Sequence, residues 1–585
     1  MSNKTATGKI FDVGVLWKVF KGVGPYKNTF ILTGAIIIAL AFLSIVRPYL
    51  IKEGLNLAFE LNDASVLWIY FLGMIAALLV ETALQYYQTY LSNLVAQSVT
   101  LDLREKLYRK VLKFRLKFFD KTPVGSFVTR LISDIDGIAQ IFSNGILTIL
   151  GDMVKLVVTI GFMFVISWKL SLMVLIPIPI LLIGTRIFQK AIKKAFTEVR
   201  NQANKINVFT QEHITGMSIV QLFNREKKEY EKFKQINKEH QNAHIKSVWA
   251  YAVFFPFVEF LSASSMALLL WYGAGQVVSQ HLNIPDLLVF IILINRLYRP
   301  IRMLADRFNV LQMGIVNAER VFTMFERDEL LNDTGTLHKK LEGNISFDNV
   351  SFAYVEKDYV LKGIDLKVNS GETVAFVGAT GAGKSSVINI LSRFYEFQKG
   401  SILLDNQDLR KYTLDAVRSQ ISVVLQEVFL FSDSIHNNIT LSNKEISREQ
   451  VIEASKIVGA HDFIMTLPGG YEYNVKERGV MLSSGQRQLI AFIRAYVANP
   501  SILVLDEATS SVDTESEELI QSAIEKLTQG RTSIIIAHRL STIQEADKIV
   551  VLDKGRIIEQ GSHKELLSQD GQYKKLFELQ FQESS

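Results

Sequence analysis

Six long apolar segments occupy the first half of the chain and restrict its fold more than any other feature of the sequence. Each is long enough to cross ~30 Å of hydrocarbon as a helix that rises 1.5 Å per residue. The alternative is that these segments are buried helices of a soluble protein, but the presence of six of them disfavours it. A single helix can cross lipid because its backbone groups form hydrogen bonds within the helix. The sequence predicts an all-α membrane domain with spans at about residues 29–51, 66–91, 145–167, 170–188, 247–275 and 286–308.

The connections between these segments differ in length and charge. Those after the second and fourth segments, 92–144 and 189–246, are long and rich in Lys and Arg, whereas the other three are short and weakly charged. Because basic loops stay on the cytoplasmic side, we expect the long connections and both termini to be cytoplasmic. This arrangement predicts a multi-pass protein of the plasma membrane, which in a bacterium is the inner membrane.

Residues 1–28 precede the first predicted span and show no cleavable signal peptide, since a short apolar core with a small-residue cleavage site is absent. Apolar residues such as Phe11 and Trp17 are interleaved with Lys9 and Lys18. This pattern predicts an amphipathic helix lying on the membrane surface, with a frayed soluble tail as the alternative.

Several ionisable side chains lie inside the predicted spans, where a charge is costly. The candidates for contact with a transported molecule are Glu81, Glu259, Arg296 and Arg299. Arg296, Arg299 and Arg302 recur every three residues and therefore share one helix face. Two alternatives to a substrate site carry equal weight. The arginines could form ion pairs with Glu81 or Glu259, or they could extend to the cytoplasmic interface.

The character of the sequence changes after residue 308. Residues 309–343 carry mixed charges, and we place the end of the membrane domain (29–320) and a linker (321–343) there. From 344 to 585, short β-rich runs alternate with helical stretches, which predicts an α/β domain with a largely parallel sheet. The modest net charge of +6 argues against nucleic acid as a partner, and the absence of cysteine excludes thiol catalysis and Cys-ligated metals.

A glycine-rich loop in the second half fits the phosphate-binding pattern G-x-x-x-x-G-K-[ST]. An apolar run at 373–377 precedes it as a predicted buried strand, and residues 386–391 follow it with helical spacing. The glycines allow the loop to wrap closely around an anion, so that its N–H groups and the N-terminus of the following helix face the phosphates of a nucleoside triphosphate. The alternative is a glycine turn before an ordinary helix. We expect Lys384 to reach the outer phosphates and Ser385 to hold Mg²⁺. The complete set of expected contacts is Gly378, Ala379, Thr380, Gly381, Ala382, Gly383, Lys384, Ser385 and Ser386.

Two further apolar strands end in residues that suit phosphate chemistry. Residues 502–505 lead to Asp506, placed to hold Mg²⁺ through water, and to Glu507, placed to polarise an attacking water. Residues 534–537 lead to His538, which could contact the γ-phosphate. Together with the glycine loop, these residues predict hydrolysis of a nucleoside triphosphate.

The second half resembles the ATP-binding cassette (ABC) family at several separate motifs. The run Leu482-Ser483-Ser484-Gly485-Gln486 is similar to the family signature and stands just before the strand that ends at Asp506, and Glu477-Arg478-Gly479 resembles a short loop of the family's exporters. The resemblance implies that Gln426 senses Mg²⁺, Tyr354 stacks on adenine, Asp513 belongs to the D-loop and His538 is the switch histidine. It also implies that a partner chain's ATP is contacted by Ser483, Gly485 and Gln486.

The first half resembles the membrane domain of an ABC exporter half-transporter. Phe118-Phe119-Asp120, followed by Pro123-Val124-Gly125, is similar to the family's first intracellular loop, whose coupling helix rests on the cassettes. Residues 212–226 around Gly216 resemble the second such loop. Spans fused ahead of a cassette imply export, because importers of the family usually carry their spans on separate chains.

One departure from the family pattern bears on the partner. Ser484 replaces the first glycine of the usual Leu-Ser-Gly-Gly-Gln signature. Chains with a drifted signature are often paired with a partner that lacks the catalytic glutamate, but this chain keeps Glu507 and His538 and its change is mild. We favour a homodimer over a heterodimer with a related half-transporter.

These features predict an ATP-driven exporter, using ATP and Mg²⁺, that moves hydrophobic or amphipathic drugs or lipids out of the cytoplasm or inner leaflet by alternating access of a dimer. The alternative is an ATP-gated channel, a regulatory membrane subunit or the catalytically competent half of a heterodimeric exporter. A weaker alternative is a soluble cassette ATPase of nucleic-acid repair or translation. Glu507 would orient water, while Lys384 and Mg²⁺ would stabilise phosphoryl charge.

Overall fold

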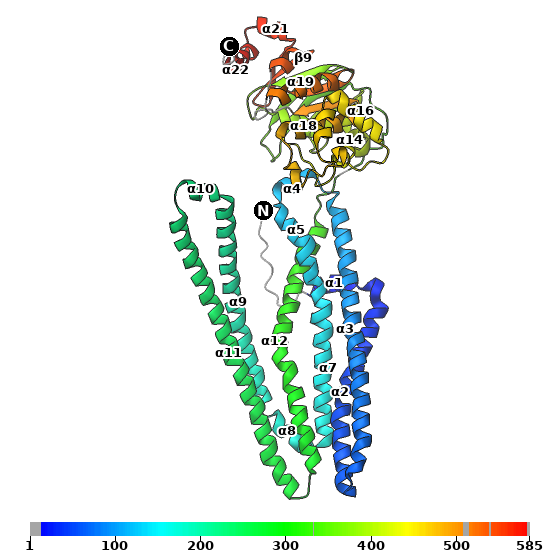
Figure 1. Ribbon diagram of the computed structural model, residues 1–585, viewed down its shortest axis with the longest axis vertical. Coiled ribbons are helices and arrows are strands. Elements are labelled where there is room, and N and C mark those ends of the chain that lie inside the picture. Colours follow the sequence, from blue (N-terminus) through cyan, green and yellow to red (C-terminus); the bar gives the residue numbers. More distant parts are fainter. Residues whose placement is uncertain (1–12, 332, 507–513, 538–539, 582–585) are drawn as a thin grey trace. The chain divides into compact units, whose positions relative to one another are not determined.

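The structure is a computed structural model that describes residues 13–331, 333–506, 514–537 and 540–581 of the 585-residue chain. Two compact units account for it (Figure 1). A helical unit comprises the described residues up to Leu112 together with Thr122–Asp328, and an α/β unit comprises Lys113–Lys121 together with the described residues from Glu329 onward.

The helical unit is built from long helices joined by short turns. Two of these turns, η3 and η4, are π-helical and lead into α7. The elements are α1 (Val13–Lys21), η1 (Gly24–Tyr26), α2 (Lys27–Leu61), η2 (Ala64–Val66), α3 (Leu67–Val111), α5 (Val124–Thr129), η3 (Arg130–Asp134), α6 (Ile135–Gln140), η4 (Ile141–Gly145), α7 (Ile146–Ile166), α8 (Trp168–Leu175), α9 (Ile178–Thr215), α10 (Met217–Leu222), α11 (Glu226–Val278) and α12 (Ile284–Glu326).

The long helices expose apolar side chains that a soluble helix would bury. Ile38 and Phe42 on α2 are 50% and 57% exposed, and Leu79 on α3 is 65% exposed. Within the described residues, five helical stretches are long and apolar enough to cross a membrane: Gly24–Leu61, Ala64–Val111, Val124–Ile166, Trp168–Thr215 and Glu226–Val278. Their outward apolar faces fit hydrocarbon, because lipid needs no polar partner.

Two predicted spans differ from the simplest expectation. The span at 170–188 is divided between α8 and α9, because Pro177 and Pro179 lack the N–H groups that a continuous helix needs. The span at 286–308 lies in α12, which is not among the five membrane-length stretches since its apolar part carries Asp286, Arg296 and Arg299. Its passage through the membrane stays a prediction.

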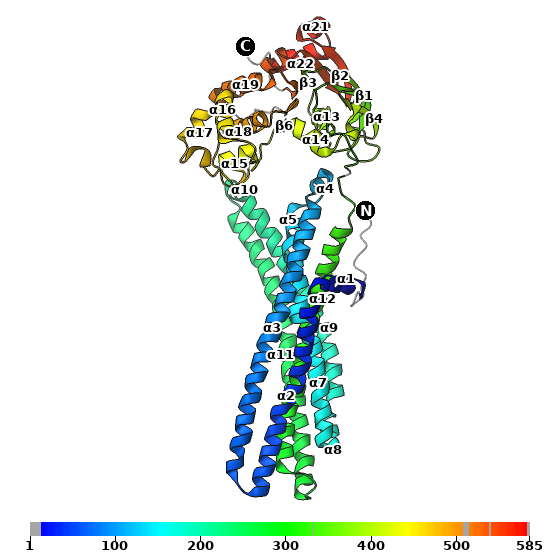
Figure 2. The same ribbon diagram turned by 90° about the vertical axis from the view of Figure 1, so that its right-hand side faces the viewer.

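Packing divides the helical unit into two groups of helices. Helices α9 and α11 lie side by side along most of their length and are joined by α10 (Figures 1 and 2). Helices α2, α3, α7 and α12 form the other group, and α12 also packs on α11. A buried apolar cluster that includes Tyr298 joins α7, α8, α9, α11 and α12. The Tyr298 hydroxyl is 2.7 Å from the Ser265 hydroxyl.

The α/β unit contains two sheets flanked by helices (Figure 2). A four-stranded antiparallel sheet has the order β2-β1-β4-β5, and a six-stranded sheet has the order β10-β9-β3-β8-β7-β6 with only the β10–β9 pair antiparallel. The strands are β1 (Ile345–Phe352), β2 (Leu361–Val368), β3 (Thr373–Val377), β4 (Lys399–Leu404), β5 (Gln407–Asp408), β6 (Ile421–Val424), β7 (Ile502–Asp506), β8 (Thr532–Ile536), β9 (Lys548–Asp553) and β10 (Arg556–Gly561).

Helices cover the six-stranded sheet on both faces, so its central strands are apolar along most of their length. In β3, Val374 and Phe376 belong to one buried cluster, while Ala375 and Val377 belong to the other. This alternation follows the period of two in a strand and explains the continuous apolar runs. The described helices are α4 (Leu116–Lys121), α13 (Lys384–Leu391), η5 (Leu409–Lys411), α14 (Leu414–Gln420), α15 (Ile435–Thr440), α16 (Arg448–Val458), α17 (His461–Thr466), η6 (Gly470–Glu472), η7 (Glu477–Gly479), α18 (Ser484–Val497), α19 (Thr514–Thr528), α20 (Leu540–Gln544), α21 (His563–Ser568) and α22 (Gln572–Phe581).

The limits of the units differ from the predicted domain limits at two places. Helix α12 continues to Glu326 and so includes the first residues of the predicted linker at 321–343. The segment Lys113–Lys121, predicted as part of the membrane domain, groups with the α/β unit. An antiparallel bridge between Phe114 and Leu330 attaches this segment, with the Arg115 amide donating to the Glu329 carbonyl at 2.8 Å.

Candidate functional site

The glycine loop joins β3 to α13 at the carboxyl edge of the parallel sheet. Gly378, Gly381 and Gly383 have φ of 150°, 84° and 109°, which L side chains rarely adopt. A Cβ at Gly378 would lie 2.2 Å from the carbonyl oxygen of Leu552 in the neighbouring strand β9. The loop therefore needs glycine both for its backbone conformation and for close packing on the sheet.

Lys384 begins α13 and turns back over the loop. Its side chain is buried, and its ammonium group donates to the carbonyl oxygens of Gly378 and of Ala379, the latter at 3.3 Å. Burial lowers the pKa of Lys384, and the nearby Asp506 carboxylate opposes that shift. The loop from Gly378 to Gly383 thus folds back to the Lys384 ammonium at the N-terminus of α13, an arrangement that suits phosphate.

A hydroxyl and a carboxylate meet beside this loop. Asp506 ends β7, in register with Ile536 of β8, which is itself in register with Phe376 of β3. The Ser385 hydroxyl lies 3.5 Å from Asp506 Oδ2. Hydroxyl and carboxylate oxygens are the ligands that Mg²⁺ prefers, so the donor set fits the predicted magnesium site.

The remaining predicted catalytic residues cluster at the same edge or lie outside the described residues. Gln426 follows β6, whose last residue Val424 pairs with Leu505, and its side chain is exposed. The parallel register therefore places Gln426 and Asp506 at neighbouring strand ends. Glu507, Asp513 and His538 lie outside the described residues, and their roles stay predictions.

Tyr354 lies against the first turns of α13. Its hydroxyl accepts from Asn389 Nδ2 at 2.8 Å and is 3.2 Å from the Ser386 hydroxyl. Its ring packs edge-on against Tyr395, with centroids 4.9 Å apart. These contacts fix an aromatic ring beside the phosphate-binding loop, and its predicted stacking on adenine remains a hypothesis.

Tyr395 connects this aromatic pair to helix α4. Its hydroxyl donates to the Asp120 carboxylate, and burial together with that carboxylate raises the pKa of Tyr395, so the phenol stays protonated. Phe118 in the same helix is buried, with its ring centroid 4.8 Å from that of Phe114. The sequence indicated α4 as a coupling helix but gave no signal for Tyr395 as its partner.

The signature segment caps helix α18. The Ser483 hydroxyl accepts from the Gln486 amide at 3.2 Å, while Gln486 Oε1 accepts from the Ser483 amide at 3.0 Å. This reciprocal capping box presents the α18 N-terminus, which favours negative charge. Ser484 is the exposed first residue of the helix and Gly485 is buried behind it, so the serine occupies a position where a side chain has room.

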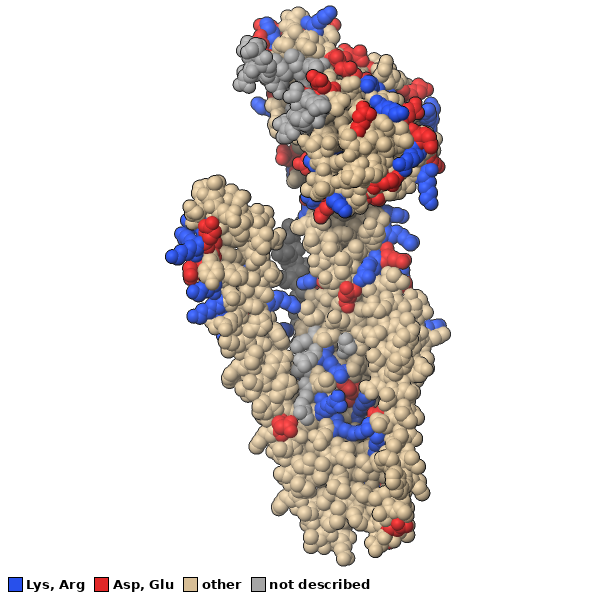
Figure 3. All heavy atoms as spheres, in the orientation of Figure 1, with Lys and Arg blue, Asp and Glu red and all other residues tan. Residues whose placement is uncertain are grey.

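In the helical unit, a polar cavity of about 680 Å³ lies between α2, α3, α7 and α12. Arg296 and Arg299 line it, as does Glu81, whose carboxylate pairs with Arg47 at 2.6 Å rather than with either arginine. Within the described residues, no ion pair joins Glu81 to Arg296 or Arg299, and the alternative of pairing with Glu81 or Glu259 stays a hypothesis. Basic side chains, with acidic ones among them, gather in a hollow of the helical unit (Figure 3).

Sequence reasoning missed several residues of this cavity. Asp152 and Lys155 on α7 and Arg307 on α12 also line it, and Asp152 pairs with Arg307 at 3.1 Å. Their signal was present, since Arg47, Asp152 and Lys155 are charged residues within predicted spans. Arg302 lies on α12, but its side chain is not among those described.

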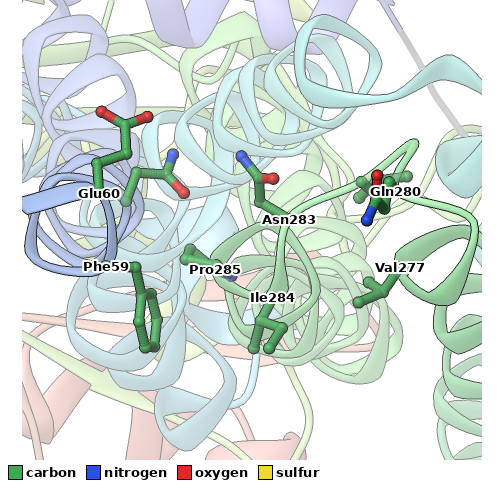
Figure 4. Close-up of a pocket in the computed structure, with 9 residues that line it drawn as sticks. Phe59, Glu60, Val277, Gln280, Asn283, Ile284 and Pro285 are labelled. Carbon is green, nitrogen blue, oxygen red and sulfur yellow. The ribbon is translucent and has the colours of Figure 1, made fainter. Parts of the chain in front are cut away.

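Glu259 belongs to a different place from the other substrate candidates. It lines a shallow apolar hollow on α11 with Phe255, Pro256 and Phe260. A further cavity of about 480 Å³ lies where α2 ends and α11 turns into α12 (Figure 4). There Glu60 and Asn283 present polar groups on one side and Phe59 an apolar ring on the other.

Comparison with known proteins accounts for both units. Residues 30–301 match the family described as ABC transporter transmembrane region, and residues 361–510 match the family described as ABC transporter. The chain is 36% identical to the ATP-dependent lipid A-core flippase of Syntrophus aciditrophicus over 97% of this chain and 94% of that protein. It is 34% identical to a putative multidrug export ATP-binding/permease protein of Bacillus subtilis over 97% of this chain and 100% of that protein.

A solved structure agrees with these sequence matches. A bacterial Atm1-family ABC exporter with ATP bound superimposes with a TM-score of 0.78 and 27% identity, over 96% of this chain and 100% of that one. The chain therefore belongs to the ABC exporter family, as an ATP-hydrolysing half-transporter that carries its transmembrane region and its cassette on one polypeptide.

Proposed function

We propose that two copies of this chain form an exporter that moves hydrophobic or amphipathic molecules, drugs or lipids, out of the cytoplasm or the inner leaflet by alternating access. The observation that carries the proposal is the presence, on one chain, of a glycine loop with Ser385 3.5 Å from Asp506 and of a charged cavity between the long helices α2, α3, α7 and α12. Relatives named as a lipid A-core flippase and as a putative multidrug export protein support both classes of cargo.

The residues of the cassette would divide the work of ATP hydrolysis. Lys384 would hold the outer phosphates, and Ser385, Asp506 and Gln426 would supply oxygen ligands to Mg²⁺, which when bound neutralises phosphate charge. Glu507 would orient the attacking water and His538 would support the γ-phosphate. Tyr354 would hold adenine, because its ring is already fixed beside α13.

A partner chain would complete each ATP site through its signature segment and its D-loop residue Asp513. In the proposed homodimer, the α18 N-terminus of one chain would face the phosphates bound to the other, through Ser483, Gly485 and Gln486. The capping box and the exposed place of Ser484 support this reading. A heterodimer is the second possibility, in which a related chain would supply the second signature.

The membrane orientation is part of the same proposal. The long basic connections, the cassette and both termini would lie in the cytoplasm of a multi-pass plasma-membrane protein. An ATP-gated channel is the rival function, and the charged cavity would suit permeant ions. Concentrative, ATP-dependent transport without single-channel conductance would exclude it.

The test is the ATPase activity of this chain, purified alone in lipid nanodiscs, beside its Glu507→Gln variant. Turnover that the variant loses supports a self-sufficient homodimer that hydrolyses ATP. Folded, ATP-binding protein with little turnover would contradict the homodimer, and restoration of turnover by a second half-transporter would establish the heterodimer.

A further inference from the structure

A cavity of about 450 Å³, which we call the cassette cavity, lies beside the antiparallel sheet of the α/β unit. Strands β1, β2, β4 and β10 and the connection between β1 and β2 contribute its lining. Four of its described side chains are basic and one is acidic: Lys357, Lys362, Lys399 and Arg556 against Asp358. Among these described lining residues there is neither Tyr354 nor any residue of the glycine loop, so the cassette cavity is not the predicted nucleotide site.

The alternation of the strands directs these basic side chains away from the core. Phe352 of β1 and Leu361 of β2 are paired and belong to a buried apolar cluster. Successive side chains of a strand point to opposite faces, so Ser351 and Lys362 face outward. Lys399 of β4 is paired with Ser351, and cross-strand partners share a face. The outer face of the sheet therefore carries two lysines, both of which are exposed.

Backbone contacts hold the other two cations near that face. The Lys362 amide donates to the carbonyl oxygen of Gly555 at 2.8 Å, which places Arg556 beside β2. A Cβ at Gly555 would lie 2.0 Å from the carbonyl oxygen of Val360, so the turn before Arg556 packs closely on β2 and its preceding turn. Lys357 lies in that preceding turn, where its φ of 72° belongs to the left-handed region. The four cations are thus gathered by the fold from distant parts of the sequence.

None of the four cations forms an ion pair with a carboxylate among the described residues. The ion pairs that the structure describes in the α/β unit join other side chains: Arg393–Glu396, Arg410–Asp408, Arg448–Glu472, Lys548–Glu372 and Lys574–Asp570. The Lys399 ammonium lies 5.3 Å from the ring centroid of Tyr359, a cation–π contact that leaves its charge in place. Like charges in one cavity repel one another, and an anion between them would be attracted by all four.

We propose that the cassette cavity binds a small polyphosphate, a ligand that presents two or more phosphate groups. Its surplus of positive charge suits several phosphates, because lysine binds phosphate as a point charge and arginine through paired N–H donors. The Ser351 hydroxyl accepts from the Gly363 amide at 3.0 Å, so its own hydrogen can be donated to a phosphate oxygen. A cavity of this volume holds a small molecule. The inference goes beyond the proposed export function and does not depend on it.

The test measures the binding of inositol hexakisphosphate to the full-length protein in nanodiscs of zwitterionic lipid, by isothermal titration calorimetry. This probe carries its phosphates around a ring and has no linear triphosphate for the glycine loop to hold. A salt concentration of about 0.15 M limits diffuse surface attraction, because the Debye length is then about 8 Å. We expect saturable binding, and its absence from the wild-type protein would overturn the proposal.

The decisive variant is Lys362→Gln combined with Lys399→Gln. Its control is Lys340→Gln combined with Lys367→Gln, two exposed lysines of the same unit that do not line the cavity. Both double variants remove the same charge. The cavity variant should bind the probe at least about tenfold more weakly, because it loses two charged donors, while the control should bind it as the wild type does. Equal weakening in both would assign binding to general surface charge and overturn the proposal.

Further variants separate the cassette cavity from the nucleotide site. Lys384→Gln should weaken ATP binding and keep probe binding. Loss of probe binding in that variant, with retention in the cavity variant, would place the probe at the glycine loop and overturn the proposal. Arg556→Lys keeps the charge and should retain most of the affinity. If the cavity variant does not fold, Arg556→Gln takes its place and should weaken probe binding, and an affinity equal to that of the wild type would overturn the proposal.

Discussion

The nucleotide site and the membrane cavity of this transporter are built in opposite ways. The nucleotide site is mostly backbone, with consecutive residues from Gly378 to Ser386 shaped by glycines and placed by one parallel sheet. The cavity is mostly side chains, with charged residues contributed by four helices, most of them far apart in sequence. A site encoded in consecutive residues can serve every member of a family, whereas a site assembled from scattered side chains can change its ligand one substitution at a time.

The largest expected effect tests the nucleotide side of this comparison. Glu507→Gln should lower ATP turnover by about 10²–10⁴-fold, because a positioned general base contributes that much, while ATP binding persists. Steady-state ATPase assays measure the loss of turnover, and binding of a fluorescent ATP analogue checks that ATP binding persists. Turnover like that of the wild type would remove Glu507 from the mechanism.

The next effect tests whether the phosphate loop depends on its backbone. Gly378→Ala should weaken ATP binding by about 10²-fold, since its Cβ would meet the Leu552 carbonyl oxygen at 2.2 Å and displace the loop. Gly371→Ala is the matched control, because Gly371 also has positive φ but no neighbour within 4 Å. Equal losses in the two variants would show that backbone strain alone, rather than contact with the sheet, explains the glycine.

A third change tests whether the cavity depends on its ion pairs. Arg47→Gln leaves Glu81 without its partner and should lower stability by roughly 1–3 kcal/mol, measured by thermal unfolding in nanodiscs. Adding Glu81→Gln should restore part of that loss. Lys246→Gln, which breaks the exposed pair with Glu198 at 2.8 Å, should change little. A similar effect from both lysine and arginine variants would contradict a special role for the cavity pair.

The smallest expected effect concerns the connection between the nucleotide site and α4. Tyr395→Phe keeps the ring beside Tyr354 but removes the hydrogen bond to Asp120. It should reduce the stimulation of ATPase by cargo about fivefold or less, because one hydrogen bond contributes about 1 kcal/mol. Asp120→Asn combined with Tyr395→Phe should cost no more than either change alone, and additive losses would show that the two residues act independently.

The sequence predicted the nucleotide site better than the cavity for a physical reason. The phosphate loop, Ser385 and Asp506 lie at neighbouring strand ends of a parallel sheet, an arrangement that apolar runs with terminal carboxylates already indicate. Pairing in the cavity depends on how helices rotate against one another. The sequence therefore identified Arg296, Arg299 and Glu81 as costly residues but not Arg47 as the partner of Glu81.

Local chemistry also limited the prediction of the helices. The prolines at 177 and 179 divide one predicted span into α8 and α9, which a count of apolar residues does not reveal. The grouping of Lys113–Lys121 with the α/β unit depends on the Phe114–Leu330 bridge and the Asp120–Tyr395 hydrogen bond, both of which join residues remote in sequence. Such contacts leave no periodic signal.

The most direct test of the account is ATP-driven movement of a fluorescent anionic lysolipid in proteoliposomes whose cassettes face the outside. The account predicts accumulation of the lipid inside the vesicles that requires ATP and is absent with Glu507→Gln. Vigorous Glu507-dependent ATP hydrolysis with no movement of the lipid beyond that of protein-free vesicles would contradict it.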